Sequence, residues 1–446
     1  MSETVTLKKD IGFKEALSIA IGQSIGTGVM AMTGQAIGFT GNGVVLAFIV
    51  AAFLVIVLFL PTAIMGSTLP ATGGAYMYGA RLLAPRWGVF YVLIFLSYNI
   101  TLSLYAISFA DYMQSLVPGI PFKLVGAALL TLFYVLNLIG VKSAAMVQKI
   151  MVLVLLSAFV LFIGYGMPQV NFEAFTSDNV VPNGIVGLMT ASALMTFAVG
   201  GSNVIANMGG EMKNPGRDIP LCMILGTGIV GVFYAFLGLV ASGVLPWTQV
   251  ANKNLSEVAR AILPGPLYTY FIIGGALFAI ATTLNSVFGW VTKPLLAAAA
   301  DGYLPSILTR VNKRFGTPHV LLTMFYLIGI VPVITGVSLQ TVSTYGSGIS
   351  IFMTIIPIAA STQLHKRYPE ACKKAFFILK PGTMNAVAVV AMILVVIQTY
   401  LLFQTLPVAA IIGAMLYGLA ALGLSIYMEK RAGKVLYTGD AEKDFQ

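Results

Sequence analysis

Long apolar stretches, separated by short polar segments, follow one another along nearly the whole chain. Most have at least the roughly 20 residues that an α-helix needs to cross the hydrocarbon core of a membrane. This pattern predicts an all-α polytopic membrane protein. Twelve transmembrane helices are expected, at residues 14–38, 43–66, 88–117, 121–141, 145–167, 184–209, 219–243, 266–300, 318–336, 340–363, 383–404 and 406–429.

Glycines are expected to interrupt two of these helices. Ile25-Gly26-Thr27-Gly28 lies in the first stretch, and Val199-Gly200-Gly201-Ser202 lies at the matching place in the sixth. A break at membrane depth frees backbone N–H and C=O groups, which only a ligand, an ion or water can satisfy there. The paired breaks therefore predict the substrate site of a transporter. The alternative is close helix packing, for which small residues are also common in membranes.

The composition and the distribution of charge agree with this class. The chain is 58% apolar and 9% charged, with a mean hydropathy of +0.92, so it lacks the polar surface of a soluble globule. Of the 25 Lys and Arg residues, all but Lys123, Lys253 and Arg260 fall on one side of the predicted topology. Because cytoplasmic loops carry an excess of basic residues, both the N-terminal segment (1–13) and the C-terminal tail (430–446) are expected to be cytoplasmic.

The residues that usually carry catalysis or bind metal ions are few and dispersed. The two cysteines, Cys222 and Cys372, and the two histidines, His319 and His365, have no spacing typical of a metal site or a catalytic triad. We therefore expect no enzymatic activity, no catalytic residue, no metal and no organic cofactor. The net charge of +10 is scattered over many short loops, so no nucleic-acid partner is expected either. The expected partners are a small-molecule substrate and the lipid of the cytoplasmic membrane.

Five short motifs then occur in a recognisable order. They are Ile25-Gly-Thr-Gly-Val-Met30, Leu69-Pro-Ala-Thr-Gly-Gly-Ala-Tyr-Met-Tyr78, Phe197-Ala-Val-Gly-Gly-Ser-Asn203, Gly210-Glu-Met-Lys-Asn-Pro215 and Asp301-Gly-Tyr-Leu-Pro305. Together they resemble the amino acid/polyamine/organocation permease superfamily, over about residues 14–310.

The resemblance implies a LeuT-like fold of two inverted repeats of five helices each. The first repeat is expected at residues 14–167 and the second at 184–363, with the first and sixth helices broken. The last two helices, at 383–429, are expected to form a peripheral pair.

At the breaks, free N–H groups can hold a substrate carboxylate and free carbonyls can hold its ammonium group. By the resemblance, Phe197 corresponds to an aromatic gate and Asn203 to a polar group near the amine; the alternatives are ordinary packing and an interhelical hydrogen bond. Ser202 and Val199 depart from the large residues that related exchangers often carry there. Tyr98, Ser103 and Asn285 are further candidates. The predicted site comprises Ile25, Gly26, Thr27, Gly28, Phe197, Ala198, Val199, Gly200, Ser202 and Asn203.

The predicted substrate is a neutral amino acid, moved by alternating access as in a secondary active transporter. No Asp or Glu falls within a turn of either break, so a cationic side chain would lack a partner in a medium of low dielectric constant. Several alternatives remain open: an exchanger or exporter without ion coupling, a cationic amino acid or polyamine antiporter, an amino-acid-sensing receptor, and a channel.

A coupling ion is the last prediction, with Na⁺ and H⁺ as candidates. By the resemblance, Na⁺ would lie between the carbonyls of Gly22 and Ile25 and the Ala279-x-x-Thr282-Thr283 run. Carbonyl and hydroxyl oxygens are ligands that hard cations prefer. Many sodium-independent relatives place a lysine where this chain has Leu155. The alternatives are that both threonines bond to their own helix, and that exchange needs no ion.

Overall fold

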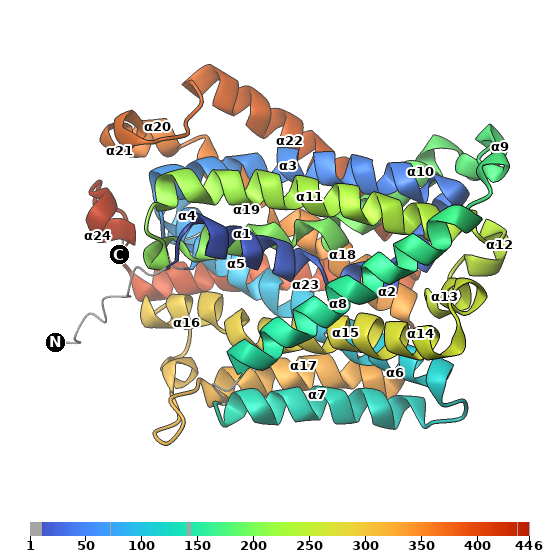
Figure 1. Cartoon of the computed structure of the whole chain (residues 1–446). Helices are drawn as coiled ribbons and strands as arrows, with labels where there is room; N and C mark the ends of the chain where they lie inside the picture. The colour runs from blue at the N-terminus through green and yellow to red at the C-terminus, as the bar shows by residue number, and fades with distance from the viewer. Residues whose placement is uncertain (1–10, 72, 141–143, 435, 446) are drawn as a thin grey trace.

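The computed structural model describes residues 11–71, 73–140, 144–434 and 436–445. Residues 1–10 of the predicted N-terminal segment, and residue 141 at the end of the fourth predicted span, lie outside the described residues. Most helices in the described part lie roughly along one common axis, and together they form a single bundle (Figure 1). The long apolar stretches of the sequence thus become helices, as predicted.

The helices of the predicted apolar stretches match those stretches within a few residues, in several cases as two or three consecutive helices. They are α1 (Phe13–Ser24), α2 (Thr27–Thr40), α3 (Val44–Thr68), α5 (Pro85–Tyr98), α6 (Leu102–Leu116), α7 (Phe122–Leu138), α8 (Ala144–Gly166), α10 (Gly184–Val199), α11 (Pro215–Gly243), α14 (Gly265–Tyr270), α15 (Phe278–Trp290), α16 (Lys293–Ala300), α17 (His319–Thr335), α18 (Leu339–Met353), α19 (Ile355–Ser361), α22 (Pro381–Phe403) and α23 (Val408–Ala432).

Short helices connect these elements. They are α4 (Gly74–Tyr78), α9 (Ser177–Val180), α12 (Trp247–Val250), α13 (Ser256–Ile262), α20 (Leu364–Arg367), α21 (Pro369–Lys374) and α24 (Ala441–Phe445). Two π-helical segments, Gly79–Leu83 after α4 and Phe271–Leu277 between α14 and α15, continue their neighbours.

Nine helical segments of the described chain are long and apolar enough to cross a membrane, the longest being Thr27–Thr68 with 42 residues. That segment joins α2 to α3 through a short 3₁₀ turn, so it contains parts of two predicted spans. The helices α7 and α17 are apolar but have only 17 residues each. The chain is therefore an all-α polytopic membrane protein.

Local sequence signals explain where several helices begin and end. Proline stands in the first turn of α5, α11 and α22, where its missing N–H costs nothing because that group has no intrahelical partner. Gly336 follows α17 with φ of 79°, and Gly433 follows α23 with φ of 60°. Both adopt the left-handed conformation that commonly closes a helix C-terminus.

The two glycine-rich stretches interrupt their helices. The helix α1 ends at Ser24, Ile25 and Gly26 are extended, and α2 begins at Thr27. The helix α10 ends at Val199, and the chain continues as a 3₁₀ helix over Gly200–Asn207. Because α1 packs against this 3₁₀ helix and α2 packs against α10, the two interruptions face each other inside the bundle.

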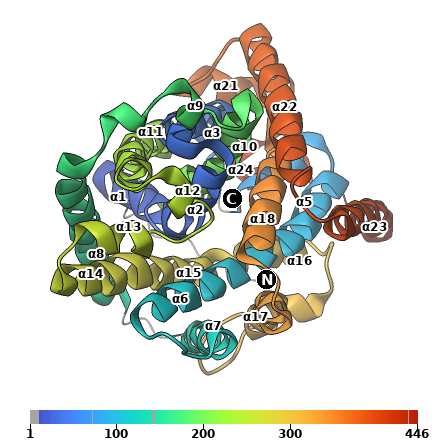
Figure 2. The same cartoon turned by 90° about the vertical axis from the view of Figure 1, so that its right-hand side faces the viewer.

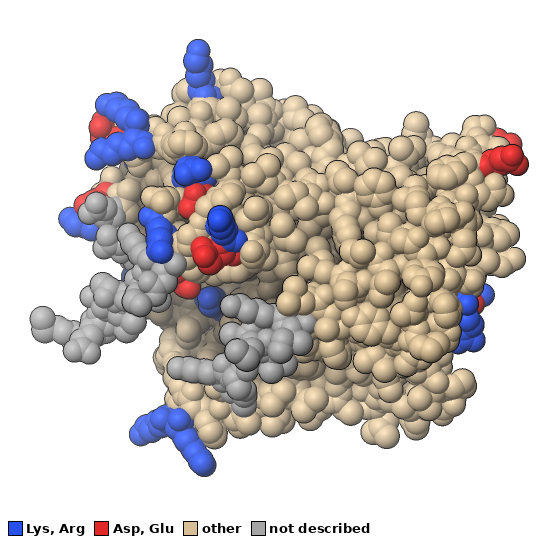
Figure 3. Space-filling model, in the orientation of Figure 1, with Lys and Arg blue, Asp and Glu red and all other residues tan. Residues whose placement is uncertain are grey.

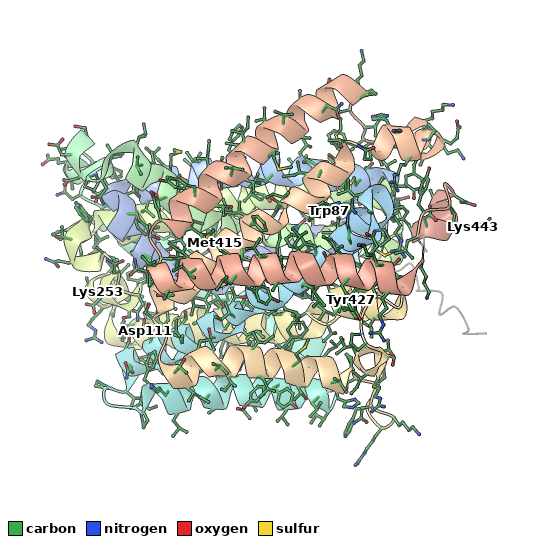
Figure 4. All side chains as sticks on the ribbon, turned by 180° about the vertical axis from the view of Figure 1, so that it is seen from behind. Trp87, Asp111, Lys253, Met415, Tyr427 and Lys443 are labelled. Carbon is green, nitrogen blue, oxygen red and sulfur yellow. The ribbon has the colours of Figure 1, made fainter. Side chains whose placement is uncertain are left out.

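The two ends of the bundle differ in charge. Lys and Arg side chains gather over one end in the space-filling view (Figure 3), where α4, α16, α20, α21 and α24 also lie (Figure 1). We call this the basic end. The helices α9, α12 and α13 lie at the opposite end. Asp111 and Lys253 are also there, while Lys443 lies at the basic end (Figure 4).

The helix α23 lies at the periphery of the bundle (Figure 2). Only Ala421 and Ser425 of its 25 residues are buried. Its exposed side chains are largely apolar, among them Met415, Leu416 and Leu419, each more than 60% exposed. An apolar surface of this kind suits contact with lipid.

Labelling of introduced cysteines should reveal the orientation of the bundle. Lys373 and Lys253 are exposed at the basic and opposite ends. In intact cells we expect a membrane-impermeant thiol reagent to modify a Lys253→Cys variant, and a Lys373→Cys variant only after permeabilisation. Both variants carry Cys372→Ala. The native Cys372 is a poor probe because burial raises the pKa of its thiol, and the thiolate is the reactive form. The reverse labelling pattern would show that the basic end faces the outside of the cell.

Candidate functional site

A cavity of about 170 Å³ lies where the two interrupted helices meet. Its lining comes from α1, α2, α10 and the 3₁₀ helix that follows it, and from α5, α6, α15, α18 and α19, together with residues of α3 and α4. Its lining residues include Gln23, Ser24, Thr27, Gly28, Ala75, Tyr91, Phe95, Tyr98, Phe197, Ala198, Gly200, Gly201, Asn203, Asn207, Thr283, Trp290 and Pro357.

Six of the ten predicted substrate residues line this cavity: Thr27, Gly28, Phe197, Ala198, Gly200 and Asn203. The other four lie beside it without lining it. Val199 is completely buried in the core, and Ser202 turns away from the cavity, where its Oγ lies 2.6 Å from Thr227 Oγ1 of α11. The short side chain of Ser202 is thus used for helix packing. Of the three further candidates, Tyr98 lines the cavity, whereas Ser103 and Asn285 hydrogen-bond to Ile100 and Asn137.

Close backbone contacts explain why glycines occupy the interruptions. A Cβ placed on Gly201 would lie 2.5 Å from the carbonyl carbon of Gln23, and one on Gly28 would lie 2.6 Å from Cα of Ala198. A Cβ on Gly26 would overlap Oγ1 of Thr283. Gly200 is different, because the nearest atom to its Cβ position is a ring carbon of Phe59 at 3.5 Å. Three of the four glycines are therefore required by packing alone.

Tyr234 of α11 bridges the interruption between α1 and α2. Its hydroxyl donates a hydrogen bond to the carbonyl of Ser24 at 2.7 Å and accepts one from the N–H of Gly26 at 3.2 Å. The side chain is fully buried. One phenol thus satisfies two backbone groups that the missing helical turn would otherwise leave unpaired.

Three buried polar atoms on the cavity wall have no hydrogen-bond partner in the described part of the chain. They are Oγ1 of Thr27, Oδ1 of Asn203 and Nε1 of Trp290. Buried polar atoms are nearly always paired in native proteins, with protein groups or with water. The Thr27 hydroxyl can donate and accept, the Asn203 Oδ1 only accepts, and the indole N–H only donates. The wall can therefore receive a ligand that both donates and accepts.

Aromatic rings form one side of the cavity. Phe95 lies 5.8 Å from Tyr98 and 5.9 Å from Trp290, measured between ring centroids, and Tyr98 lies 6.4 Å from Phe197. Sequence reasoning missed Tyr91, Phe95 and Trp290. Positions 91, 95 and 98 are four and three residues apart, which places them on one face of a helix. That spacing was a usable signal, although it is equally typical of ordinary core packing.

The described cavity lining contains no charged side chain. The acidic residue Asp111 of α6 lies instead at the opposite end, where Nδ2 of Asn254 donates to its carboxylate at 2.6 Å. An ionic ligand group in this cavity would have only backbone dipoles, hydroxyls, amides and aromatic rings as partners.

The residues of the predicted ion site have other contacts. Oγ1 of Thr282 donates to the carbonyl of Phe278 at 2.8 Å, and Oγ1 of Thr283 donates to that of Ala279 at 2.7 Å. Both threonines therefore bond to their own helix. Thr283 also lines the cavity next to Gly26, whereas Gly22 is half-buried on α1. Leu155, at the position of the lysine of some relatives, is fully buried in the core.

The cavity extends toward the basic end of the bundle, because its lining includes Ala75 of α4 and Pro357 of α19. At the opposite end, the loop between α12 and α13 covers α2. The N–H of Asn252 donates to the carbonyl of Gly34 at 2.7 Å, and the N–H of Leu255 donates to the hydroxyl of Tyr112 at 3.1 Å. That hydroxyl in turn donates to the carbonyl of Met30 at 3.0 Å.

Replacing Tyr234 should destabilise the protein. The Tyr234→Phe variant leaves the Ser24 carbonyl and the Gly26 N–H buried without a partner, at a cost of about 1–3 kcal/mol. We expect a lower unfolding temperature in detergent, measured by the fluorescence of a thiol-reactive dye. Tyr165→Phe is the control, because that side chain is 44% exposed on α8. Equal unfolding temperatures for the two variants would show that the bridge contributes nothing.

Comparison with known proteins identifies the family of this chain. The sequence model of the amino acid permease family matches residues 11–438. A branched-chain amino acid permease of Bacillus subtilis is 25% identical over 397 residues, which cover 82% of this chain and 83% of the relative. A methylthioribose transporter of the same organism is 27% identical, covering 83% and 84%, and its serine/threonine exchanger is 27% identical, covering 71% and 74%. The chain belongs to the amino acid permease family and is a transporter, not an enzyme.

Proposed function

We propose that this protein is a secondary active transporter that moves neutral amino acids across the cytoplasmic membrane by alternating access. The observation that carries the proposal is an uncharged cavity, lined by unpartnered polar atoms, at the meeting point of two interrupted helices. In the proposed topology twelve helices cross the membrane, the first ten as two inverted repeats (14–167 and 184–363), with the basic end in the cytoplasm.

The substrate carboxylate is proposed to lie at the N-terminus of α2. The first turn of a helix has N–H groups without intrahelical partners and a positive dipole end, which together favour an anion. Thr27 and Gly28 begin that turn and line the cavity, and Oγ1 of Thr27 adds a free donor. The N–H of Gly26 is not used in this arrangement, because it already donates to Tyr234.

The substrate ammonium group is proposed to lie at the end of α10. The last carbonyls of a helix have no intrahelical partners and carry the negative end of the dipole. Ala198, next to the end of α10, lines the cavity, and Oδ1 of Asn203 supplies an unpaired acceptor on the following 3₁₀ helix. An α-amino acid has both groups on one carbon, and so spans the short distance between the two helix ends.

The substrate side chain is proposed to be neutral and to lie against the aromatic side of the cavity. An unpaired charge buried there would cost several kcal/mol. Two related proteins are named for branched-chain amino acids and for serine and threonine, which are neutral, whereas another is named a cationic amino acid transporter. Tyr98, Phe197 and Trp290 offer apolar surface for such side chains, with a single indole N–H for specificity.

Coupling to Na⁺ is proposed for the site formed by the carbonyls of Gly22 and Ile25 and the hydroxyls of Thr282 and Thr283. Both hydroxyls donate to their own helix, which uses the hydrogen and leaves oxygen lone pairs available to a cation. The serine/threonine relative is named an exchanger, so exchange without a coupling ion is the competing arrangement. Transport measured in different salts separates them.

Uptake of radiolabelled solutes into proteoliposomes tests substrate and coupling together. We expect saturable uptake of at least one of leucine, valine, serine and threonine. Its apparent affinity should be at least tenfold higher than that of arginine, a difference in binding free energy of about 1.4 kcal/mol. An inward Na⁺ gradient should stimulate it relative to K⁺ or choline at fixed pH, and a Thr282→Ala/Thr283→Ala double variant should lose the stimulation.

Other results would point to a different substrate or a different function. Arginine preference would favour a cationic substrate, and uptake of methylthioribose alone would remove amino acids as substrates. Flux that never saturates would indicate a channel, and binding without uptake a receptor. Equal uptake in the three salts would exclude Na⁺ coupling.

Two adjacent glycines provide a matched test of the site. In Gly201→Ala the new methyl group meets the Gln23 backbone at 2.5 Å, whereas in Gly200→Ala its nearest neighbour is 3.5 Å away. We expect Gly201→Ala to weaken binding of the best substrate at least tenfold, because it displaces α1 next to the carboxylate site. Gly200→Ala should change it by less than about threefold. Isothermal titration of both purified variants measures this, and equal affinities would contradict the proposed position of the site.

A further inference from the structure

The last residues of the described chain return to the bundle after α23. The segment Leu436–Phe445, which ends in α24, lies against the basic end (Figure 1). Two of its side chains are almost fully buried, Asp444 with 4% and Phe445 with 6% of its surface exposed. Burial of these two side chains, one of them a carboxylate, requires specific contacts with the bundle.

Phe445 is held by two tyrosines from distant parts of the chain. Its ring centroid lies 6.0 Å from that of Tyr78 in α4 and 5.6 Å from that of Tyr368, which follows α20. The Tyr368 hydroxyl donates to Oδ2 of Asp444 at 2.7 Å. The Asp444 carboxylate also accepts hydrogen bonds from the N–H groups of Thr438 and Gly439, which fold the segment on itself.

Two arginines also contact the segment Leu436–Phe445. Nε of Arg81 donates to the carbonyl of Asp444 at 2.9 Å, and the guanidinium of Arg367 lies 4.6 Å from the ring centroid of Tyr437. The Tyr437 hydroxyl donates to the carbonyl of Arg367 at 3.1 Å. We call Tyr78, Arg81, Arg367 and Tyr368 the tail socket. Its rings and cations match the aromatic and acidic side chains of the segment, Phe445 and Asp444.

Arg81 also fixes the socket to the rest of the basic end. Its Nη1 and Nη2 donate to the two carboxylate oxygens of Asp301 at 2.8 and 3.3 Å, and the Tyr76 hydroxyl donates to the same carboxylate at 2.6 Å. Burial, followed by the charge of Asp301, raises the pKa of Tyr76, so its phenol remains a donor throughout the physiological range. A bidentate pair of this kind is geometrically specific.

The socket is joined directly to the cavity through α4. This five-residue helix carries Tyr78 of the socket and Ala75 of the cavity wall. Gly74 approaches Asn207 so closely that a Cβ would overlap the Asn207 side chain, which also lines the cavity. A displacement of α4 therefore changes the cavity at its basic end, and the docked segment opposes that displacement.

We propose that the tail socket is a recognition surface for the protein's own C-terminal segment, and that the docked segment slows transport by holding α4 in the arrangement described here. Contacts made in one conformation and lost in another stabilise the first and raise the barrier to leaving it. The kinetic part of this inference rests on the proposed transport function. The docking itself does not.

A spin label on the segment measures docking without transport. Lys443 is exposed, so a label at Lys443→Cys, in a background of Cys222→Ala and Cys372→Ala, reports mobility without disturbing the socket. We expect slow motion in the parent. Phe445→Ala should convert most of the signal to fast motion, and the socket variant Tyr368→Phe, which loses the donor to Asp444, should convert a smaller fraction. Phe376→Ala is the matched control, because that ring is 66% exposed at the basic end.

Exchange of the best substrate by the same proteins in proteoliposomes tests the consequence. We expect Phe445→Ala to raise the turnover number at least threefold, Tyr368→Phe to raise it less, and Phe376→Ala to leave it unchanged. A label that stays slow in both variants would overturn the recognition. A label that is released with unchanged or reduced turnover would overturn the restraint on transport. If no substrate is transported by any variant, the proposed function fails while the mobility result still decides the docking.

Discussion

Backbone hydrogen bonding inside a membrane is the constraint on which this structure depends. Lipid offers no partner for N–H and C=O groups, so every crossing segment must be helical unless protein, ligand or water satisfies its backbone. The chain obeys this rule along almost all of its apolar length and departs from it at Ile25–Gly26 and after Val199. Both departures lie inside the bundle, next to one another and around one cavity.

The polar groups around these departures differ in whether they have hydrogen-bond partners. At the first interruption Tyr234 satisfies the Ser24 carbonyl and the Gly26 N–H. Around the cavity, by contrast, Thr27, Asn203 and Trp290 keep buried polar atoms that have no partner among the described residues. The protein thus separates the backbone groups that maintain the interruption from the groups that are available to a ligand. Glycines occupy these positions mainly because α1, α2 and the chain after α10 approach one another too closely to leave room for a Cβ.

The sequence was sufficient for the all-α polytopic class and for the position of the two helix interruptions, because both follow from local signals. Apolar length predicts the helices within a few residues, and paired glycines predict the interruptions. Side-chain direction was harder to predict. Ser202 and Val199 stand in the right motif but face α11 and the core. Trp290 and Phe95 come from other helices, and only the packing of α5 and α15 around the cavity brings them together. Such convergence depends on tertiary contacts that periodicity does not encode.

The Tyr234 bridge has a consequence for how tightly a ligand can be held. If the interruption closed into a regular helix whenever the cavity was empty, each ligand would have to unwind α1 again, and part of its interaction energy would be lost in doing so. Because a phenol keeps the interruption open, the binding surface is preorganised. Differences between ligands can then appear almost fully as differences in affinity. A small, uncharged cavity can in this way discriminate between similar side chains with only a few contacts.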